Sequence, residues 1–260
     1  MTEKSTLNFL YQPAENAANA QTMVFLHGLF GDLNNLGVIA KAFAEQYAIL
    51  RVDLRNHGRS FHTPEMDYSL IAQDLKTLLI ELNIQNAIVV GHSMGGKSAM
   101  ALAALAPELV EKLVVIDIAP VTYTQNRHKQ IIAGLFAVKA AKPQTRQQAK
   151  SVMAEYIPDE GVQQFMLKSF DPESSQSFRF NLTALEQNYQ NLMDWHAVKV
   201  EKPTLFIKGA LSDYIQAEHT DTILAQFPQA KSFIVANADH WVHAEKPEAV
   251  VRAITKFLAK

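Results

Sequence analysis

The sequence predicts one α/β domain, built on a mostly parallel sheet with helices on both faces. Short runs of apolar and β-branched residues alternate with longer segments of helical periodicity along most of the 260 residues. A hydrophobic content of 48% is sufficient for one large core. One long block, residues 120–195, lacks strand patterns and predicts a helical insertion into this fold.

The N-terminal half alternates strand and helix in order. Strand candidates are short, mostly apolar runs, at Leu7–Tyr11, Met23–His27, Ile49–Asp53, Asn86–Val90 and Leu113–Ile118. Helix candidates carry apolar residues at helical spacing or are rich in alanine and leucine, at Leu36–Gln46, Tyr68–Leu82 and Gly96–Ala106. Pro107 ends the third helix.

The C-terminal half contains the insertion and the end of the sheet. Helical segments separated by prolines are expected at Asn126–Lys142, Gln144–Tyr156, Gly161–Phe170 and Phe178–Met193. Strands Thr204–Ile207 and Ser232–Val235 and a final helix, Pro247–Leu258, follow. The insertion leaves the sheet at its carboxyl edge, where open α/β sheets bind ligands. We therefore expect a core of residues 1–119 and 196–260 with a helical cap of residues 120–195.

Composition and charge exclude several classes of protein. A net charge of −2 creates no field that would attract nucleic acid or an anionic membrane. The absence of cysteine excludes disulfides, thiolate catalysis and zinc–thiolate sites. No apolar run reaches the length of a membrane span, and the first residues do not resemble a signal peptide. A cytoplasmic location is expected, and nothing in the sequence predicts an oligomeric state.

Gly91-His92-Ser93-Met94-Gly95 is the most informative motif. It joins a buried strand to a helix, and its two glycines permit the close approach of the two backbones at a sharp turn. Ser93 then lies at a helix N-terminus, where free N–H groups and the helix dipole favour negative charge. This context predicts a nucleophilic serine.

A serine nucleophile needs a histidine base, and the chain has nine histidines. His240 is favoured because it follows the last strand by a short polar loop and comes after the serine and the candidate acids in chain order. His92 is interpreted as a packing residue. The spacing of His243 from His240 lacks a matching carboxylate motif, so no metal site is expected.

The acid that orients the histidine has two candidates. Asp117 ends the strand that follows the nucleophile helix, and Asp213 lies in the loop after the strand Thr204–Ile207. The usual acid in that later loop lies three residues after the glycine, a position that Ser212 occupies here. Since Asp213 is displaced by one residue, Asp117 is favoured and Asp213 remains the alternative.

The oxyanion of the reaction should be bound by two backbone amides. One is the amide of Met94, the residue after the nucleophile, and the other is that of Leu29, on the loop after the strand Met23–His27. Gly28 and Gly31 would allow this loop to approach a substrate closely.

These motifs resemble the α/β-hydrolase superfamily over nearly the whole chain. The resemblance rests on four segments: residues 27–31 (HGLFG), 53–60 (DLRNHGRS), 91–96 (GHSMGG) and 238–241 (ADHW). Within the superfamily, residues 117–120 (DIAP) and 240–247 (HWVHAEKP) are similar to the bacterial YbfF-type acyl-CoA esterases. The resemblance implies a capped serine esterase and supports Asp117 as the acid. Asp239 departs from the pattern, because the superfamily commonly has glycine there.

The expected function is therefore hydrolysis of an ester or acyl-CoA thioester through an acyl-serine, with no cofactor and no metal. Basic cap residues are candidates for binding CoA phosphates: Arg127, Lys129, Lys139, Lys142, Arg146 and Lys150. Apolar cap residues are candidates for an acyl pocket: Leu135, Phe136, Met153, Phe165 and Met166. The alternatives on this fold are a carbon–carbon bond hydrolase, a cofactor-free haloperoxidase and a non-catalytic ligand receptor.

Overall fold

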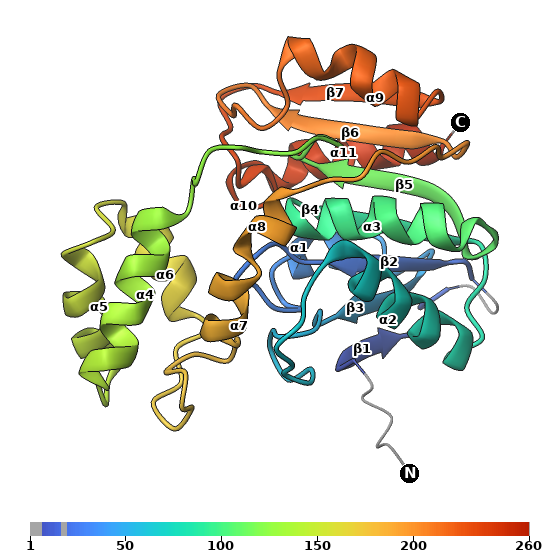
Figure 1. The fold of residues 1–260 in the computed structure, drawn as a ribbon. Coiled ribbons are helices and arrows are strands. Elements are labelled where there is room, and N and C mark those ends of the chain that lie inside the picture. The colour runs from blue at the N-terminus through green and yellow to red at the C-terminus, as the bar shows by residue number, and fades with distance from the viewer. Residues whose placement is uncertain (1–6, 17–19, 260) are drawn as a thin grey trace.

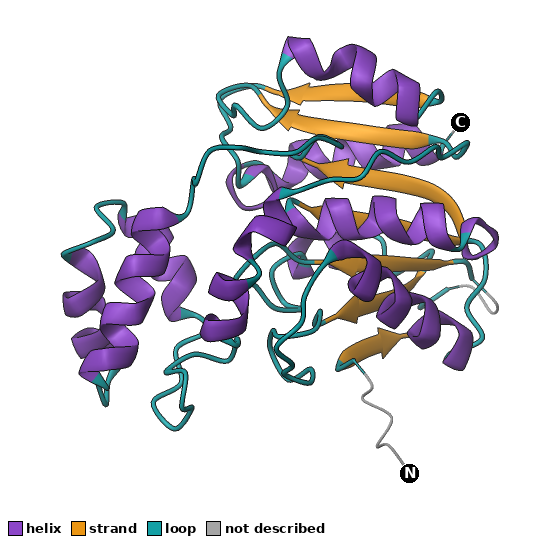
Figure 2. Cartoon of the chain, in the orientation of Figure 1, coloured by secondary structure: helices purple, strands orange, loops and turns teal. Residues whose placement is uncertain are grey.

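A seven-stranded sheet between two layers of helices forms the centre of the protein (Figures 1 and 2). The computed structural model describes residues 7–16 and 20–259. The strand order is β1-β3-β2-β4-β5-β6-β7, with β1 antiparallel to β3 and every other neighbouring pair parallel. The strands are β1 (Phe9–Gln12), β2 (Thr22–Leu26), β3 (Ala48–Val52), β4 (Ala87–His92), β5 (Val110–Ile116), β6 (Thr204–Gly209) and β7 (Ala230–Val235). The predicted fold class is confirmed.

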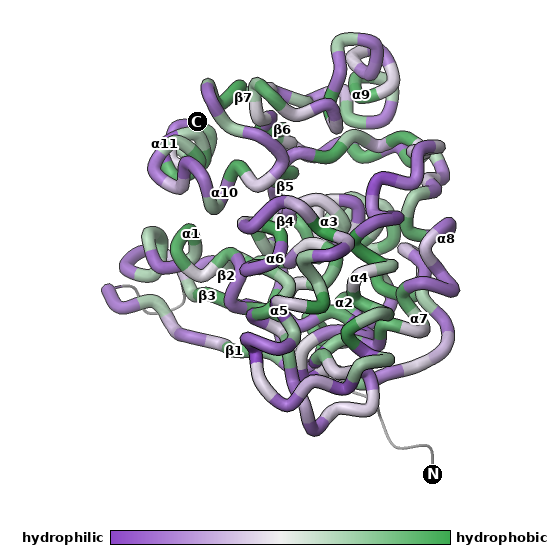
Figure 3. Tube along the Cα trace, turned by 90° about the vertical axis from the view of Figure 1, so that its left-hand side faces the viewer, coloured by the Kyte–Doolittle hydropathy of each residue, from purple (hydrophilic) through white to green (hydrophobic). Residues whose placement is uncertain are grey.

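Helices cover both faces of this sheet. Helices α1 (Gly37–Lys41) and α11 (Pro247–Leu258) lie on one face. Helices α2 (Tyr68–Glu81), α3 (Met94–Leu105) and α9 (Thr220–Gln226) lie on the other, as Figure 3 shows from the side. Short helical turns complete the core: η1 (Pro107–Leu109), η2 (Ala217–His219) and α10 (Val242–Glu245). Among the described residues, no helix is long and apolar enough to cross a membrane.

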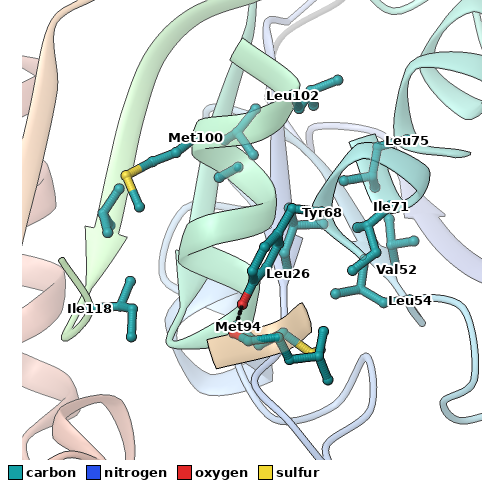
Figure 4. Close-up of a cluster of buried hydrophobic side chains, with 14 of the residues drawn as sticks. Leu26, Val52, Leu54, Tyr68, Ile71, Leu75, Met94, Met100, Leu102 and Ile118 are labelled. Atoms are coloured by element: carbon teal, nitrogen blue, oxygen red, sulfur yellow. Dashed lines mark hydrogen bonds between the residues drawn. The ribbon is translucent and has the colours of Figure 1, made fainter. Parts of the chain in front are cut away.

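Successive side chains of each buried strand point to opposite faces of the sheet, so each strand contributes to two hydrophobic cores. In β2, Met23 and Phe25 pack in the core beneath α1 and α11, while Val24 and Leu26 pack in the core beneath α2 and α3. Figure 4 shows this second core, in which Leu26 and Met100 belong to one cluster with residues of α2. Because both faces of β2 and β4 are covered, these strands are buried at every residue.

The strand register gathers the functional segments at one edge of the sheet. Leu26 pairs with Gly91, and His92 pairs with Ile116, which in turn pairs with Ile207. The carboxyl ends of four neighbouring parallel strands therefore lie side by side. The segments that follow these strands contain the predicted oxyanion loop, the predicted nucleophile and both candidate acids.

The segment between β5 and β6 is helical, with one isolated bridge between Phe170 and Phe178. Its helices are α4 (Lys129–Ala141), α5 (Arg146–Ala154), α6 (Glu160–Leu167), α7 (Leu182–Gln187) and α8 (Tyr189–Met193). Helices α4, α5 and α6 extend beyond the carboxyl ends of the strands, at the left of Figure 1. The N-cap side chains Thr145, Asp159 and Asn181 each accept a hydrogen bond from a first-turn amide, which explains where α5, α6 and α7 begin.

A buried lysine ties this helical segment to the nucleophile helix. Lys97 of α3 is 1% exposed, and its ammonium donates to the carbonyls of Met193 and Asp194, each at 3.0 Å. The rings of Tyr123 and Trp195 lie 5.0 and 5.8 Å from the ammonium. Carbonyl oxygens and aromatic faces replace part of the lost hydration of a buried cation. Both ends of the helical segment therefore contact α3.

Several boundaries differ from the sequence predictions. The helix expected over 36–46 ends at Lys41. Directly beyond it, backbone amides bond to the carbonyl three residues earlier, and the α-helical pattern of four residues is lost. The helix expected over 178–193 divides into α7 and α8 at Asn188, whose side-chain amide donates to the Ala184 carbonyl. Helix α9 is absent from the predictions because its few apolar residues do not make a recognisable period.

Candidate active site

Ser93 lies at the turn between β4 and α3 with an unusual backbone conformation. Its φ of 53° and ψ of −119° are costly for a residue with a side chain. A Cβ on Gly91 would lie 2.1 Å from the Gly95 carbonyl oxygen, and one on Gly95 would lie 2.2 Å from the Leu26 oxygen. Only glycine fits at both positions, so the two glycines of the motif are a steric requirement of the turn.

His240, from the segment between β7 and α10, contacts both Ser93 and Asp117. Its Nε2 lies 3.0 Å from Ser93 Oγ, and its Nδ1 lies 2.8 Å from Asp117 Oδ2. Because the carboxylate only accepts, Nδ1 carries the proton, and Nε2 is free to accept the serine hydroxyl. Three residues from distant parts of the chain thus form one continuous line of hydrogen bonds.

Asp117 is fully buried and satisfied at both carboxylate oxygens. Its Oδ1 accepts the Gly209 amide at 2.9 Å, and its Oδ2 accepts the hydroxyl of Ser212 in addition to His240. Ser212, which occupies the sequence position of the usual acid in the later loop, therefore donates its hydroxyl to the carboxylate at the end of the preceding strand. From the sequence, Ser212 stands out only because it replaces the usual acid, and its hydrogen bond to Asp117 is not predicted.

Asp213, the alternative acid, lies elsewhere. Its side chain is 59% exposed and forms an ion pair with Arg127. Of the two candidate acids, the structure brings only Asp117 to His240. The one-residue displacement noted in the sequence turns the Asp213 carboxylate away from the imidazole.

Burial sets the charge states of Asp117 and His240. It raises the pKa of Asp117 to about 6, against the opposing effect of the hydrogen bonds from Ser212 and Gly209. Burial also lowers the pKa of His240 to about 3. At pH 7 both shifts leave an ionised carboxylate beside a neutral imidazole, which is the state that a general base requires.

These pKa shifts predict the pH dependence of the reaction. We expect kcat/KM to be constant from about pH 7 to about pH 9 and to fall in acid, with an apparent pKa below about 6.5, the ordinary value for histidine. One proton added to the coupled Asp117–His240 pair removes the base, so the loss is a property of the pair. A pH–rate profile with a p-nitrophenyl ester measures it. An acid limb centred above about pH 7 would contradict the expectation.

The loop after β2 lies beside Ser93, and buried histidines hold it in shape. His57 Nε2 accepts the amide of Phe30 at 3.2 Å, and His27 Nε2 accepts that of Leu54 at 3.0 Å. Within the described residues, the amides of Leu29 and Met94 have no acceptor. Leu29 and Met94 line one small cavity together with Ser93. Two unpartnered N–H groups at such a place are the feature that an oxyanion site needs.

A cavity of about 540 Å³ opens over Ser93 between the core and the helical segment. Apolar side chains of α4 and α6 form one wall, namely Ile131, Val162, Phe165 and Met166. Phe165 also lies against Trp241, with ring centroids 5.2 Å apart. The Tyr214 ring, which the sequence reasoning missed, stacks on the His240 ring at 3.7 Å. Its position after Ser212 carries no pattern by which it could have been found.

The cap residues singled out in the sequence have different places. Of the apolar candidates, Phe165 and Met166 line the cavity, whereas Leu135 and Met153 are fully buried inside the helical segment and Phe136 does not reach the cavity. Of the basic candidates, Arg127 lines the cavity. The others do not: Lys129, Lys142 and Arg146 are exposed, Lys139 bonds to Gln176 and Thr183, and Lys150 pairs with Glu160.

Two further expectations from the sequence concern His92, interpreted as a packing residue, and Asp239, which stands where the superfamily commonly has glycine. His92 also lies 2.9 Å from the His240 carbonyl oxygen through its Nε2. Asp239 keeps a negative φ and accepts the His240 amide, so this position does not need the glycine common in the superfamily. Over residues 7–16 and 20–259, no group of three or more potential metal ligands is found.

The mostly parallel sheet with helices on both faces agrees with the family described as alpha/beta hydrolase fold, whose model matches residues 21–247. The chain belongs to this family. It is 47% identical to Esterase YbfF of Escherichia coli, over 97% of this chain and 98% of that protein. It is 56% identical to a putative esterase/lipase of Haemophilus influenzae, over 99% of this chain and 90% of that protein.

Solved structures agree with these relatives. A marine microorganism esterase superposes with a TM-score of 0.90 at 32% identity, covering 97% of this chain and 99% of that one. The chain is therefore an α/β-hydrolase esterase of the YbfF type, a hydrolase that acts on ester bonds. The interpretation as a non-catalytic receptor is set aside.

Proposed function

We propose that the chain is a serine esterase that cleaves carboxylic esters and acyl-CoA thioesters with small to medium acyl groups through an acyl-serine intermediate. The observation that carries the proposal is the line of hydrogen bonds from Ser93 through His240 to Asp117 at the floor of a partly apolar cavity. The cavity volume of about 540 Å³ lies in the range of small-molecule sites.

The proposed reaction has two half-reactions. Ser93 Oγ attacks the substrate carbonyl while its proton passes to His240 Nε2, and the amides of Leu29 and Met94 stabilise the oxyanion. The imidazolium, held by Asp117, then protonates the leaving alcohol or thiol, and the carbon–oxygen or carbon–sulfur bond breaks. Water attacks the acyl-serine with the same base, releases the carboxylic acid and restores the serine.

We further propose that residues 120–195 act as the cap and residues 1–119 and 196–260 as the hydrolase core. The apolar wall from α4 and α6 supports binding of the acyl chain beneath this cap. The Arg127 side chain supports binding of an anionic leaving group, because it lines the same cavity and its buried Nε has no partner among the residues that the structure describes. The cytoplasmic location expected from the sequence stays a prediction.

The thioester part of this proposal predicts a selective effect of Arg127. We expect Arg127→Met to lower kcat/KM for an acyl-CoA about 10-fold more than for the p-nitrophenyl ester of the same acyl group, since only CoA carries phosphates for the guanidinium. The measurement is a panel of both substrate types from acetyl to palmitoyl. The p-nitrophenyl ester serves as the internal control for any disturbance of the site.

Lys129→Met is the matched variant, because Lys129 is an exposed cation two residues away that does not line the cavity. It should leave the ratio of the two kcat/KM values within about 2-fold of the wild-type ratio. An equal loss on both substrates in Arg127→Met would count against CoA recognition by Arg127. Hydrolysis of p-nitrophenyl esters alone, with no turnover of any acyl-CoA, would restrict the function to carboxylic esters.

A further inference from the structure

His92 lies between the predicted nucleophile Ser93, the base His240 and the oxyanion loop, although it is not assigned to any of these three parts of the site. It precedes Ser93 directly in the chain and is 4% exposed. Its ring lies against Gly28 of the oxyanion loop, since a Cβ on Gly28 would lie 3.0 Å from His92 Nδ1. The centroid of its ring is 4.9 Å from that of His240. One side chain thus contacts the base and the loop that precedes Leu29.

The hydrogen bond from His92 has a defined direction. His92 Nε2 lies 2.9 Å from the carbonyl oxygen of His240, and a carbonyl only accepts. Nε2 therefore carries the hydrogen, and the ring is the neutral tautomer with Nδ1 unprotonated. Burial favours this neutral form, because it lowers the pKa of His92 to about 3. The bond persists at every pH where the base functions.

This hydrogen bond joins the segment that carries the base, residues 238–241, to a residue that lies far from it in the sequence. Within the segment, the His240 amide donates to Asp239 and the Asp239 amide donates to Glu245. From other elements, the Leu211 amide donates to the Ala238 carbonyl at 2.9 Å, and the Tyr214 ring stacks on the His240 ring. Among the described residues, His92 is the only donor to the His240 carbonyl. Since the imidazole of His240 must lie 3.0 Å from Ser93 Oγ, the position of its own backbone decides whether the proton can be transferred.

We propose that His92 is a positioning residue, which uses its Nε2–H to hold the His240 backbone at the distance that Ser93 requires. The inference rests on the proposed function, because it concerns proton transfer between Ser93 and His240. Through the peptide bond to Ser93, His92 links nucleophile and base in one rigid unit. It does not touch the substrate carbonyl and takes no proton during the reaction.

The test compares variants of His92 that keep or remove the donor. His92→Phe keeps a ring but has no donor, His92→Leu is a smaller apolar replacement, and His92→Gln keeps an N–H at a similar reach. We expect both apolar variants to lose about 10- to 100-fold in kcat with KM changed by less than about 2-fold. We expect His92→Gln to recover to within about 5-fold of the wild-type kcat. Steady-state kinetics and the rate of fluorophosphonate labelling of Ser93 measure the effect, and thermal unfolding identifies any variant that does not fold.

His243→Phe is the matched control. His243 is 6% exposed and its ring packs on the His92 ring with centroids 4.2 Å apart, yet its buried Nδ1 has no hydrogen-bond partner among the described residues. It should lose less than about 3-fold in kcat. An equal loss in His92→Gln and the folded apolar variants would overturn the proposal, as would wild-type kcat in either apolar variant. If the wild-type protein itself is not labelled at Ser93, the proposed function fails instead, whatever the His92 variants do.

Discussion

Ser93→Ala is expected to lower kcat for ester hydrolysis by at least about 10⁴-fold, because it removes the hydroxyl oxygen that would form the proposed acyl-serine. The amides of Leu29 and Met94 and the binding cavity remain in the variant and account for the small activity that persists. Labelling by a fluorophosphonate probe should disappear completely. Hydrolysis of a p-nitrophenyl ester and the labelled mass of the intact protein measure the two effects.

Ser98→Ala is the control for this variant. Ser98 lies on the same helix, is buried, and its hydroxyl donates to the Met94 carbonyl at 2.8 Å, with no contact to His240. We expect it to retain kcat within about 3-fold, since a helical serine-to-carbonyl bond contributes little. Full labelling of Ser93→Ala would show that a different residue is the nucleophile.

Asp117→Asn is expected to reduce kcat by about 10³- to 10⁴-fold, the second largest effect. An asparagine side chain can donate to His240 Nδ1, and this would place the imidazole proton on Nε2, where the serine hydroxyl must be accepted. The imidazolium formed during the reaction would also lose its buried counter-charge. The measurement is kcat at a pH on the plateau of the profile.

Asp213→Asn tests the alternative acid under the same conditions. Asp213 is exposed and pairs with Arg127, so its loss should change kcat by less than about 5-fold. Both variants remove one carboxylate and keep the side-chain shape, which makes them a matched pair. A larger loss in Asp213→Asn than in Asp117→Asn would reverse the assignment of the acid.

The local parts of the site are those that the sequence predicts best. The strand–turn–helix around Ser93 follows from Gly91 and Gly95, whose steric role is confirmed by the close backbone contacts at both positions. The predicted strands are all present, with ends that shift by a few residues. Errors concentrate where short-range signals are weak, as at the division between α7 and α8 and at α9.

The contacts between distant segments are beyond sequence patterns. Ser212 reads as an ordinary loop residue until the ends of β5 and β6 lie side by side and its hydroxyl reaches Asp117. Tyr214 and His92 likewise acquire their contacts with His240 only through the packing of three loops. The same packing separates cap residues that line the cavity, such as Phe165, from those that fill the interior of the cap.

By itself, the amino-acid sequence determined the fold class, the nucleophile turn and the identity of the histidine candidate, because these depend on periodicity, glycine positions and chain order. Only the tertiary structure places the carboxylate of Asp117, and not that of Asp213, against His240 and shows the hydrogen bond from His92 to the His240 carbonyl. The physical reason is that hydrogen bonds act over about 3 Å. Which carboxylate lies that close to an imidazole more than a hundred residues away depends on strand register and loop direction, which no local pattern encodes.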